Sequence, residues 1–307
     1  MLPAPGFHHL HLRSTDPEAA IAFYVRQFPS CVRGEWAGFP ALLSPNDVKV
    51  LFELVDAPAP KLPQSAIWHF GWHVPDSRAT TAACDAREEV INRPLFSGVA
   101  DGDVLISSDT WFRNGDLLGV TRAQIAELQA EGAPIPGGAG FAYFEGPEEA
   151  LFEIAGDYDQ ERFNHIHMWQ EDPLCAQLWY QKHLNAAPRA SFGDAGVTEA
   201  DCKVPRTPDQ SFPSLTPEGM YRAPRGGVTF GDVDMMWYPN QGDSPLVSSR
   251  GQFQDHIGLS VEDLDAWTEK LKGEGVTFLS EAYPLGDTRA FMIEGPSREA
   301  LVLVEVR

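Results

Sequence analysis

The sequence predicts an α+β fold built from four related modules. One pattern, a strand that opens on a histidine and reaches an aspartate seven residues later, occurs four times in 307 residues. Apolar residues fill most of the intervening places, and the aspartate stands where a helix would begin. Because the chain has only nine histidines, four of them at one point of a repeat indicate duplicated modules. The four copies open at His9, His69, His165 and His256.

The first and third modules, residues 6–56 and 162–240, share a second feature. In both, the aspartate that ends the pattern precedes a proline, which suits the first turn of a helix. Each module closes with a strand that follows an Asp-Val pair. When the modules are aligned on that pair, Glu53 of the first stands where Tyr238 stands in the third.

The second and fourth modules, residues 66–156 and 252–307, are also copies of one another. Both open with H-x-G-x-x-V, and both close with EGP followed by EAL. Aligned on EAL, Leu303 falls where Glu153 stands, and Glu305 follows two residues later. The second module contains an insertion of about residues 77–119, which is expected to form a surface loop or a lid over a substrate cavity.

The order of the modules is therefore A-B-A-B. It predicts two domains of paired modules, residues 1–158 and 159–307, with a proline-broken connection between the first two modules. Short connections favour the packing of consecutive modules, so the first is expected to pair with the second. The alternative pairs the first module with the fourth and the second with the third, and the sequence leaves both open.

Composition and charge limit the classes of partner. With 43% apolar and 22% charged residues and no apolar run long enough to cross a bilayer, the chain predicts a globular protein without a membrane partner. The N-terminus lacks a secretory signal, so a cytoplasmic location is expected. A net charge of −21 argues against nucleic acid and leaves a small-molecule substrate, with the chain a monomer or a homo-oligomer. Four scattered cysteines without a CxxC pair predict reduced, structural thiols: Cys31, Cys84, Cys175 and Cys202.

The repeated histidines, together with two glutamates, predict a metal site. Glu53 and Glu153 lie in otherwise apolar strands, where a buried carboxylate needs compensation. A single strand histidine is more often a hydrogen-bonded core residue, but a shared cation explains the repetition and both carboxylates together. Imidazole and carboxylate ligands suit a divalent ion such as nickel, cobalt, zinc, manganese or ferrous iron. Further histidines share these strand faces, as supporting groups or core residues, namely His11, His73 and His167.

Tryptophans on or near the predicted strands have two readings. They either line an apolar cavity or belong to the ordinary core, which is the more common place for strand aromatics. These residues are Trp68, Trp72, Trp111, Trp169 and Trp237.

These residues and repeats resemble the vicinal oxygen chelate superfamily, which includes glyoxalase I, bleomycin-resistance proteins and extradiol dioxygenases. The resemblance implies four βαβββ modules in two pairs, each pair forming a cupped sheet around a metal. Glyoxalase I uses histidine or glutamine with glutamate from each of two modules. The matching set here is His9, Glu53, His69 and Glu153, with Glu153 as the catalytic base.

The extradiol dioxygenases of the superfamily imply a different site. They place two histidines and one glutamate in the C-terminal pair of modules, where His165 and His256 match the histidines. Leu303 replaces the glutamate, and Tyr238 stands at the other carboxylate position. The alternative metal site is therefore His165, Tyr238 and His256.

Three functions follow from this resemblance. The first is a glyoxalase-type lyase or isomerase, in which a divalent metal holds two neighbouring substrate oxygens while Glu153 removes a proton to give an enediolate. The second is an Fe(II)-dependent ring-cleaving dioxygenase. This function is favoured if the first module pairs with the fourth and the second with the third. The third is a bleomycin-resistance-like protein that binds a drug-like molecule without turnover.

Overall fold

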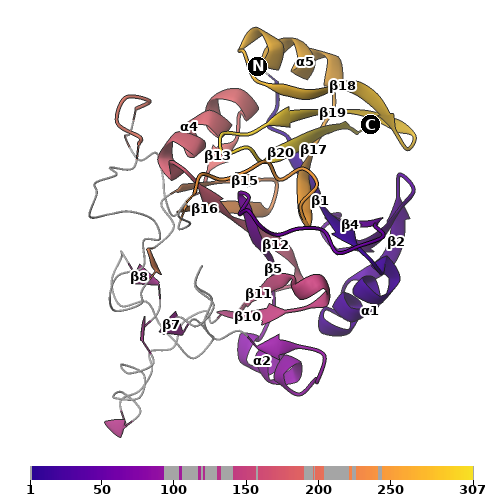
Figure 1. Cartoon of the computed structure of the whole chain (residues 1–307), viewed down its shortest axis with the longest axis vertical. Coiled ribbons are helices and arrows are strands. Elements are labelled where there is room, and N and C mark those ends of the chain that lie inside the picture. The colour runs from indigo at the N-terminus through magenta and orange to yellow at the C-terminus, as the bar shows by residue number, and fades with distance from the viewer. Residues whose placement is uncertain are drawn as a thin grey trace.

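The fold consists of two large sheets with the helices at their periphery (Figure 1). It is seen in a computed structural model that describes residues 2–92, 104–105, 117–118, 120–121, 130–132, 141–156, 158–189, 196, 198–203, 221–222, 226–240 and 244–306. The predicted α+β class is confirmed.

The first sheet combines modules one and four and is called the 1/4 sheet. Its eight strands run in the order β18-β19-β20-β17-β1-β4-β3-β2. Their bounds are β1 Gly6–Ser14, β2 Val32–Trp36, β3 Phe39–Leu43, β4 Lys49–Leu54, β17 Gln254–Val261, β18 Phe278–Leu285, β19 Thr288–Glu294 and β20 Ala300–Glu305.

The second sheet combines modules two and three and is called the 2/3 sheet. Its eight strands run in the order β13-β15-β16-β12-β5-β11-β10-β6. Their bounds are β5 Ile67–His73, β6 Ile91–Asn92, β10 Phe141–Glu145, β11 Leu151–Ala155, β12 Arg162–Gln170, β13 Ala187–Pro188, β15 Gly226–Phe230 and β16 Val233–Pro239.

The module helices follow the first strand of each module, as predicted. They are α1 Pro17–Gln27, α2 Ser77–Asp85, α4 Pro173–Leu184 and α5 Leu264–Gly273. The repeated aspartate caps three of them, because the side chains of Asp16, Asp76 and Asp263 each accept a hydrogen bond from the third backbone N–H of the helix. The remaining elements are the 3₁₀-helix η1 Pro147–Glu149 and two ribbons, β7 Val104–Leu105 with β9 Val120–Thr121 and β8 Leu117–Leu118 with β14 Tyr221–Arg222.

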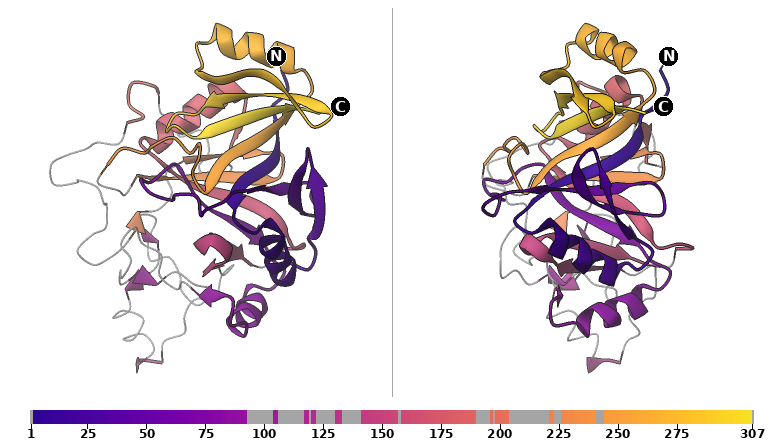
Figure 2. Two further views of the ribbon diagram at one scale, coloured as in Figure 1. Left: turned by 45° about the vertical axis from the view of Figure 1, so that its right-hand side comes forward. Right: turned by 90° about the vertical axis from the view of Figure 1, so that its right-hand side faces the viewer.

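The expected pairing of consecutive modules is wrong. At the centre of the 1/4 sheet, β1 pairs antiparallel with β17, and Figure 2 shows these strands side by side in indigo and orange. In the 2/3 sheet, β5 pairs antiparallel with β12. Each sheet thus takes one module from either side of the boundary expected between residues 158 and 159. Both B modules open with H-x-G and both A modules with H-x-H, so the strand patterns fit either pairing, and packing between distant segments decides.

One hydrophobic core lies between the two sheets. Alternation along β1 places Leu10 and Leu12 in this core, and along β5 it places Phe70 and Trp72 there. The stacked rings of Phe7 and Phe163, 5.7 Å apart, join the sheets. The histidines of the same strands consequently lie on the opposite, outer faces of the two sheets.

The predicted insertion begins later than expected. Residues 77–85 form α2, because Asp76 supplies a helix cap just as Asp16 does in module one. The rest of the expected insertion lies mostly outside the described residues, and so does the predicted lid over the substrate cavity.

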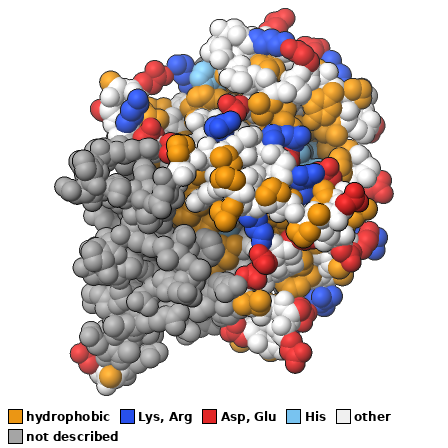
Figure 3. Space-filling model, in the orientation of Figure 1, with side chains coloured by type: hydrophobic (Ala, Val, Ile, Leu, Met, Phe, Trp, Pro, Cys, Tyr) orange, Lys and Arg blue, Asp and Glu red, His pale blue; other side chains and the backbone are white. Residues whose placement is uncertain are grey.

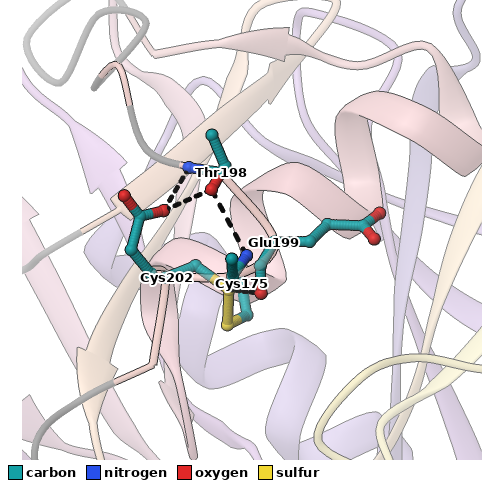
Figure 4. Close-up of a disulfide and its surroundings, with 6 residues drawn as sticks. Cys175, Thr198, Glu199 and Cys202 are labelled. Atoms are coloured by element: carbon teal, nitrogen blue, oxygen red, sulfur yellow. Dashed lines mark hydrogen bonds between the residues drawn. A yellow bond between two sulfur atoms is a disulfide. The ribbon is translucent and has the colours of Figure 1, made fainter.

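Two of the four cysteines are bonded, contrary to the expectation of reduced thiols. Cys175 on α4 and Cys202 form a disulfide, and Figure 4 shows it beside Thr198 and Glu199. The wide spacing of the two residues gave no sign of this, because α4 and the chain after β13 meet only in the folded protein. Cys31 and Cys84 are buried free thiols, as predicted.

The surface of the described residues carries many charged side chains, as expected for a chain with 22% charged residues. Figure 3 shows acidic and basic side chains interspersed over one face of the molecule. Among the described residues, no helix is both long and apolar enough to span a membrane.

Candidate metal centres

The larger of two histidine clusters lies on the outer face of the 2/3 sheet. The antiparallel register of β5 and β12 sets His69 opposite His167 and Gly71 opposite His165. Glu153 on β11 pairs with Gly71 on the other side of β5. Because side chains alternate along each strand, these three histidines and the glutamate project from one patch of the sheet. We call them the 2/3 cluster.

The carboxylate of Glu153 is the centre of this cluster. Its Oε2 atom lies 2.9 Å from Nε2 of His69, 3.4 Å from Nε2 of His165 and 3.5 Å from Nδ1 of His167. One ligand atom from each of the four residues falls within 4.8 Å of the other three. All four side chains are buried, and Glu153 is only 5% exposed. A cation of first-row size fits such a set of converging donors.

The donor chemistry of the 2/3 cluster also fits a metal. Nε2 of His165 and both ring nitrogens of His167 are buried and form no hydrogen bond with any residue that the structure describes, which is rare for buried polar atoms in proteins. Burial lowers the pKa of His69 to about 4, so its imidazole is neutral and able to donate a lone pair. Burial by itself would raise the pKa of Glu153, but His165 and His167 hold it well below its usual value. An ionised Glu153 carboxylate beside a neutral His69 imidazole is a protonation state in which both groups are able to bind a metal.

A second cluster repeats this arrangement on the outer face of the 1/4 sheet. There β1 and β17 set His11 opposite His256, and His9 opposite Gly258. The three histidines are buried, and their ligand atoms also lie within 4.8 Å of one another. We call them the 1/4 cluster. Burial, followed by the neighbouring histidines, lowers the pKa of His9 well below its usual value.

The carboxylate positions differ between the two clusters. Glu53 pairs with Arg13 across β4 and β1, and Tyr238 pairs with Trp169 at the same place in the 2/3 sheet, as the sequence alignment predicted. Glu53 is not the buried carboxylate that was expected. Its side chain is 41% exposed, and Nε of Arg13 holds it at 3.1 Å.

The counterpart of Glu153 in module four is Val302, not Leu303. Val302 pairs with Gly258 just as Glu153 pairs with Gly71. Leu303 belongs to the core between the sheets, so its side chain lies on the other face of β20. The alignment on EAL was one residue out of register, and a shift of one residue exchanges the two faces of a strand. Glu305 pairs with Arg289 at the end of β20 and is not part of the 1/4 cluster.

The four ligands of the leading sequence prediction do not meet at one site. His9 and Glu53 lie on the 1/4 sheet, whereas His69 and Glu153 lie on the 2/3 sheet. The alternative set is divided as well, because His256 belongs to the 1/4 cluster while His165 and Tyr238 lie on the 2/3 sheet. The reason is that module one pairs with module four and module two with module three, whereas the expected sets assumed that consecutive modules pair.

His11 and His167, expected only as supporting groups or core residues, belong to the two clusters. Each is the second histidine of an H-x-H pair, and alternation places it on the ligand face beside the first. An H-x-H strand contributes two histidines and an H-x-G strand contributes one. Pairing one strand of each kind therefore indicates three histidines per cluster. The glycine leaves space for the ring of the opposite histidine.

Aromatic side chains surround the 2/3 cluster on one side. The ring of Trp68 lies 4.3 Å from that of His69, and Trp169 stacks on Trp68 at 4.2 Å. Tyr143 and Tyr238 contact the rings of His69 and His167, at 5.0 and 5.4 Å. Trp68 and Trp169 also line a cavity of about 510 Å³.

The other three tryptophans have different places. Trp72 and Trp237 are fully buried in the core, which is the more common place for an aromatic residue on a strand. Trp111 lies outside the described residues.

Comparison with known proteins finds a family model that matches the C-terminal part of the chain. The model of the Glyoxalase/Bleomycin resistance protein/Dioxygenase superfamily matches residues 162–303, which hold module three and most of module four. This part of the chain is similar to that superfamily, which is also called the vicinal oxygen chelate superfamily. No curated protein sequence matches the chain at a significant level.

Solved structures are similar in fold to nearly the whole chain. Glyoxalase I from Zea mays is 14% identical, with a TM-score of 0.60 over 98% of this chain and 92% of the maize chain. A candidate dioxygenase from Bacillus subtilis is 10% identical, with a TM-score of 0.57 over 99% of this chain and 86% of that one. At such identities the likeness concerns the fold, so the reaction has to be argued from the residues of the two clusters. Divalent metals are the usual cofactors of vicinal oxygen chelate proteins, and the 2/3 cluster is able to hold one.

Proposed function

We propose that the protein is an Fe(II)-dependent ring-cleaving dioxygenase whose centre is the 2/3 cluster. The supporting observation is the donor set, because one buried glutamate and three buried histidines converge, with no second carboxylate among the described residues. Histidines with a single carboxylate are typical of non-haem iron oxygenases. A ferrous ion held by His69, Glu153, His165 and His167 would supply the redox centre at which O₂ reacts with an aromatic substrate.

The glyoxalase-type lyase needs a further carboxylate, which the described part of this centre does not hold. That reaction requires a carboxylate to remove a proton from carbon, and the position at which Glu53 would stand is occupied by Tyr238. The remaining glutamate, Glu153, is surrounded by imidazoles that hold its pKa low, which makes it a weak base. The geometry therefore favours the dioxygenase, which needs no carboxylate base.

The aromatic side chains indicate the class of substrate. The rings of Trp68 and Trp169 are stacked and line a cavity of about 510 Å³, and the Trp68 ring also contacts that of His69 in the cluster. A flat ring with two neighbouring hydroxyl groups, as in a catechol, matches such walls through its faces and a metal through its oxygens. Both atoms of O₂ enter the product as one ring carbon–carbon bond breaks, so the reaction consumes one O₂ per catechol.

The test is oxygen uptake by protein purified without air and loaded with ferrous iron. Substituted catechols should consume O₂ and yield coloured ring-opened products in equal amounts. Glu153→Gln should abolish uptake, while the matched variant Glu53→Gln should retain it. Turnover of a hemithioacetal without O₂ would instead establish the lyase, and tight binding of aromatic compounds without turnover would establish sequestration.

A further inference from the structure

The cavity of about 510 Å³ continues the face of the 2/3 sheet that carries the 2/3 cluster. Two of its lining residues, Leu151 and Trp169, lie on strands that also supply the cluster. Leu151 stands two residues before Glu153 on β11, and alternation turns both to one face. Trp169 stands two residues after His167 on β12 in the same way. Because β11 runs parallel to β5 and β12 antiparallel, both steps, of about 7 Å each, lead toward the same end of the sheet.

The size of the cavity exceeds the needs of a single aromatic ring. A cavity of about 150 Å³ is enough to hold benzene. A ring held at the 2/3 cluster therefore has room for a substituent that extends along the strands into the 510 Å³ cavity. The chemistry of the cavity wall then decides which substituents are accepted.

The charged groups of the cavity are already paired. Among its described lining residues only Lys61 and Glu149 carry a charge, and Nζ of Lys61 lies 2.7 Å from Oε2 of Glu149. A carboxylate on a ligand would thus enter without a counter-ion of its own, and the burial of an unpaired charge is costly. The net charge of −21 opposes an anion further. The cavity therefore disfavours anionic substituents.

Two glutamines of the cavity wall offer hydrogen-bond acceptors. Nε2 of Gln252 donates to the carbonyl oxygen of Pro63 at 3.1 Å. Nε2 of Gln254 donates to the carbonyl oxygen of Trp68 at 3.1 Å. Since a backbone oxygen only accepts, these bonds fix both amides with Oε1 as the remaining group.

Neither Oε1 atom has a donor among the residues that the structure describes. Both atoms are buried, and the side chains of Gln252 and Gln254 are each 7% exposed. Buried acceptors without a donor are rare in proteins. A ligand that brings an N–H or O–H group into the cavity supplies the donor that is missing.

We propose that this cavity is a specificity pocket, which selects catechols whose substituent is uncharged and carries a hydrogen-bond donor, such as a carboxamide. Gln252 and Gln254 are its specificity-determining residues, and the Lys61–Glu149 ion pair keeps it closed to carboxylates. This assignment rests on the proposed dioxygenase function, because it places the reacting ring at the 2/3 cluster.

The experiment compares two catechols that differ only in charge and donor, 3,4-dihydroxybenzamide and 3,4-dihydroxybenzoate. Isothermal titration of the metal-free, full-length protein under argon measures binding without turnover. The amide should bind at least about 10-fold more tightly, the scale of leaving a buried polar group unpaired. Equal affinities, a preference for the carboxylate or binding of neither compound would overturn the proposal.

Gln254→Ile tests the acceptor. Gln254 pairs with Leu12 just as Ile67 pairs with Met168 in the other sheet, so isoleucine suits this place in the strand. The variant should bind the amide about 10-fold more weakly and 4-methylcatechol, which has no donor on its substituent, as tightly as the wild type does. An unchanged preference for the amide in this variant and in Gln252→Leu would contradict the role of the glutamines.

Glu149→Gln tests the ion pair from the opposite direction, by a gain of binding. It leaves the ammonium of Lys61 without its carboxylate, so the affinity for 3,4-dihydroxybenzoate should rise about 5-fold. Glu199→Gln is the matched control, because it releases Lys182 from an exposed pair of 2.8 Å that does not line the cavity. Equal effects of the two substitutions would remove Lys61 and Glu149 from the pocket.

The pocket and the reaction fail separately. Oxygen uptake with catechols, without a preference for the amide in the titrations, would retain the dioxygenase and overturn the pocket. A preference for the amide without oxygen uptake would retain the selection of uncharged ligands and overturn the dioxygenase.

Discussion

The imidazole of His165 lies over Gly71, in the space that a side chain at residue 71 would occupy. A Cβ atom built on Gly71 would come within 2.2 Å of Nε2 of His165. The same relation recurs in the 1/4 sheet, where a Cβ on Gly258 would lie 2.0 Å from the ring of His9. The H-x-G strand thus provides the space into which the H-x-H strand places its first ligand.

Gly71→Ala should therefore disrupt the 2/3 cluster without removing any ligand. The methyl group displaces the ring of His165, and we expect the affinity for a divalent metal to fall by at least about 10-fold, the scale of losing a group that orients a ligand. Isothermal titration of the metal-free protein measures this. Gly273→Ala is the matched control, since a Cβ there meets nothing within 4 Å. Equal affinity in both variants would contradict the role of Gly71.

Glu153→Gln should cause a far larger loss at the 2/3 cluster than Glu53→Gln causes at either cluster. Glu153 is 5% exposed and is the only carboxylate in its group, whereas the Glu53 side chain is 41% exposed and paired with Arg13. Removing the only charged ligand of a buried cation leaves its charge uncompensated, which costs about 3–5 kcal/mol. Metal content after dialysis against a weak chelator distinguishes the two variants. Metal loss from Glu53→Gln would show that its carboxylate leaves Arg13 and binds the ion.

Trp169→Leu should weaken the binding of aromatic substrates. The stacked pair of Trp169 and Trp68 lines a cavity of about 510 Å³, and the Trp68 ring also lies 4.3 Å from that of His69 in the 2/3 cluster. Loss of one stacking ring amounts to about 0.5–1.5 kcal/mol, so we expect KM for a catechol to rise about 2–10-fold while kcat changes little. Trp36→Leu, at the edge of the 1/4 sheet, serves as the control. A fall in kcat at constant KM would place Trp169 among the groups needed for the reaction itself.

Glu299→Gln should flatten the pH dependence of stability. Glu299 is fully buried and accepts hydrogen bonds from Gln170 and Tyr180, at 2.9 and 2.8 Å, so it joins module four to module three. Burial raises the pKa of this carboxyl. A group with a raised pKa binds more protons in the folded than in the unfolded state. Its stabilisation is therefore complete below the unfolded pKa, near 4.3, and is lost as the pH rises through the folded value.

Urea unfolding at several pH values tests this. Between pH 4 and neutrality, the free energy of unfolding of the wild type should fall relative to that of Glu299→Gln. Glu149→Gln provides the control, because Glu149 stands at the same place in the EAL motif with its side chain 77% exposed. Parallel profiles for wild type and Glu299→Gln would mean that Glu299 stays ionised in the folded protein.

The sequence by itself determined the modules, their helices and the faces of their strands. The repeated histidine and aspartate mark a strand that ends in a capped helix, as Asp16, Asp76 and Asp263 show. Alternation along a strand is a local property, so it placed Leu10 in the core and His9 on the ligand face. The identity of Tyr238 as the counterpart of Glu53 followed from the same local pattern.

Only the tertiary structure decided which histidines meet. Both B modules offer the same H-x-G strand to either A module, so local pattern fits both pairings equally, and long-range packing selects β17 for β1 and β12 for β5. That choice brings Glu153 to three histidines and places Val302 at the equivalent position beside the 1/4 cluster. Register is equally non-local, because a shift of one residue moved Leu303 into the core and Val302 to the ligand face. Sequence fixes which side chains are able to bind a metal, while the partner strand determines which of them share it.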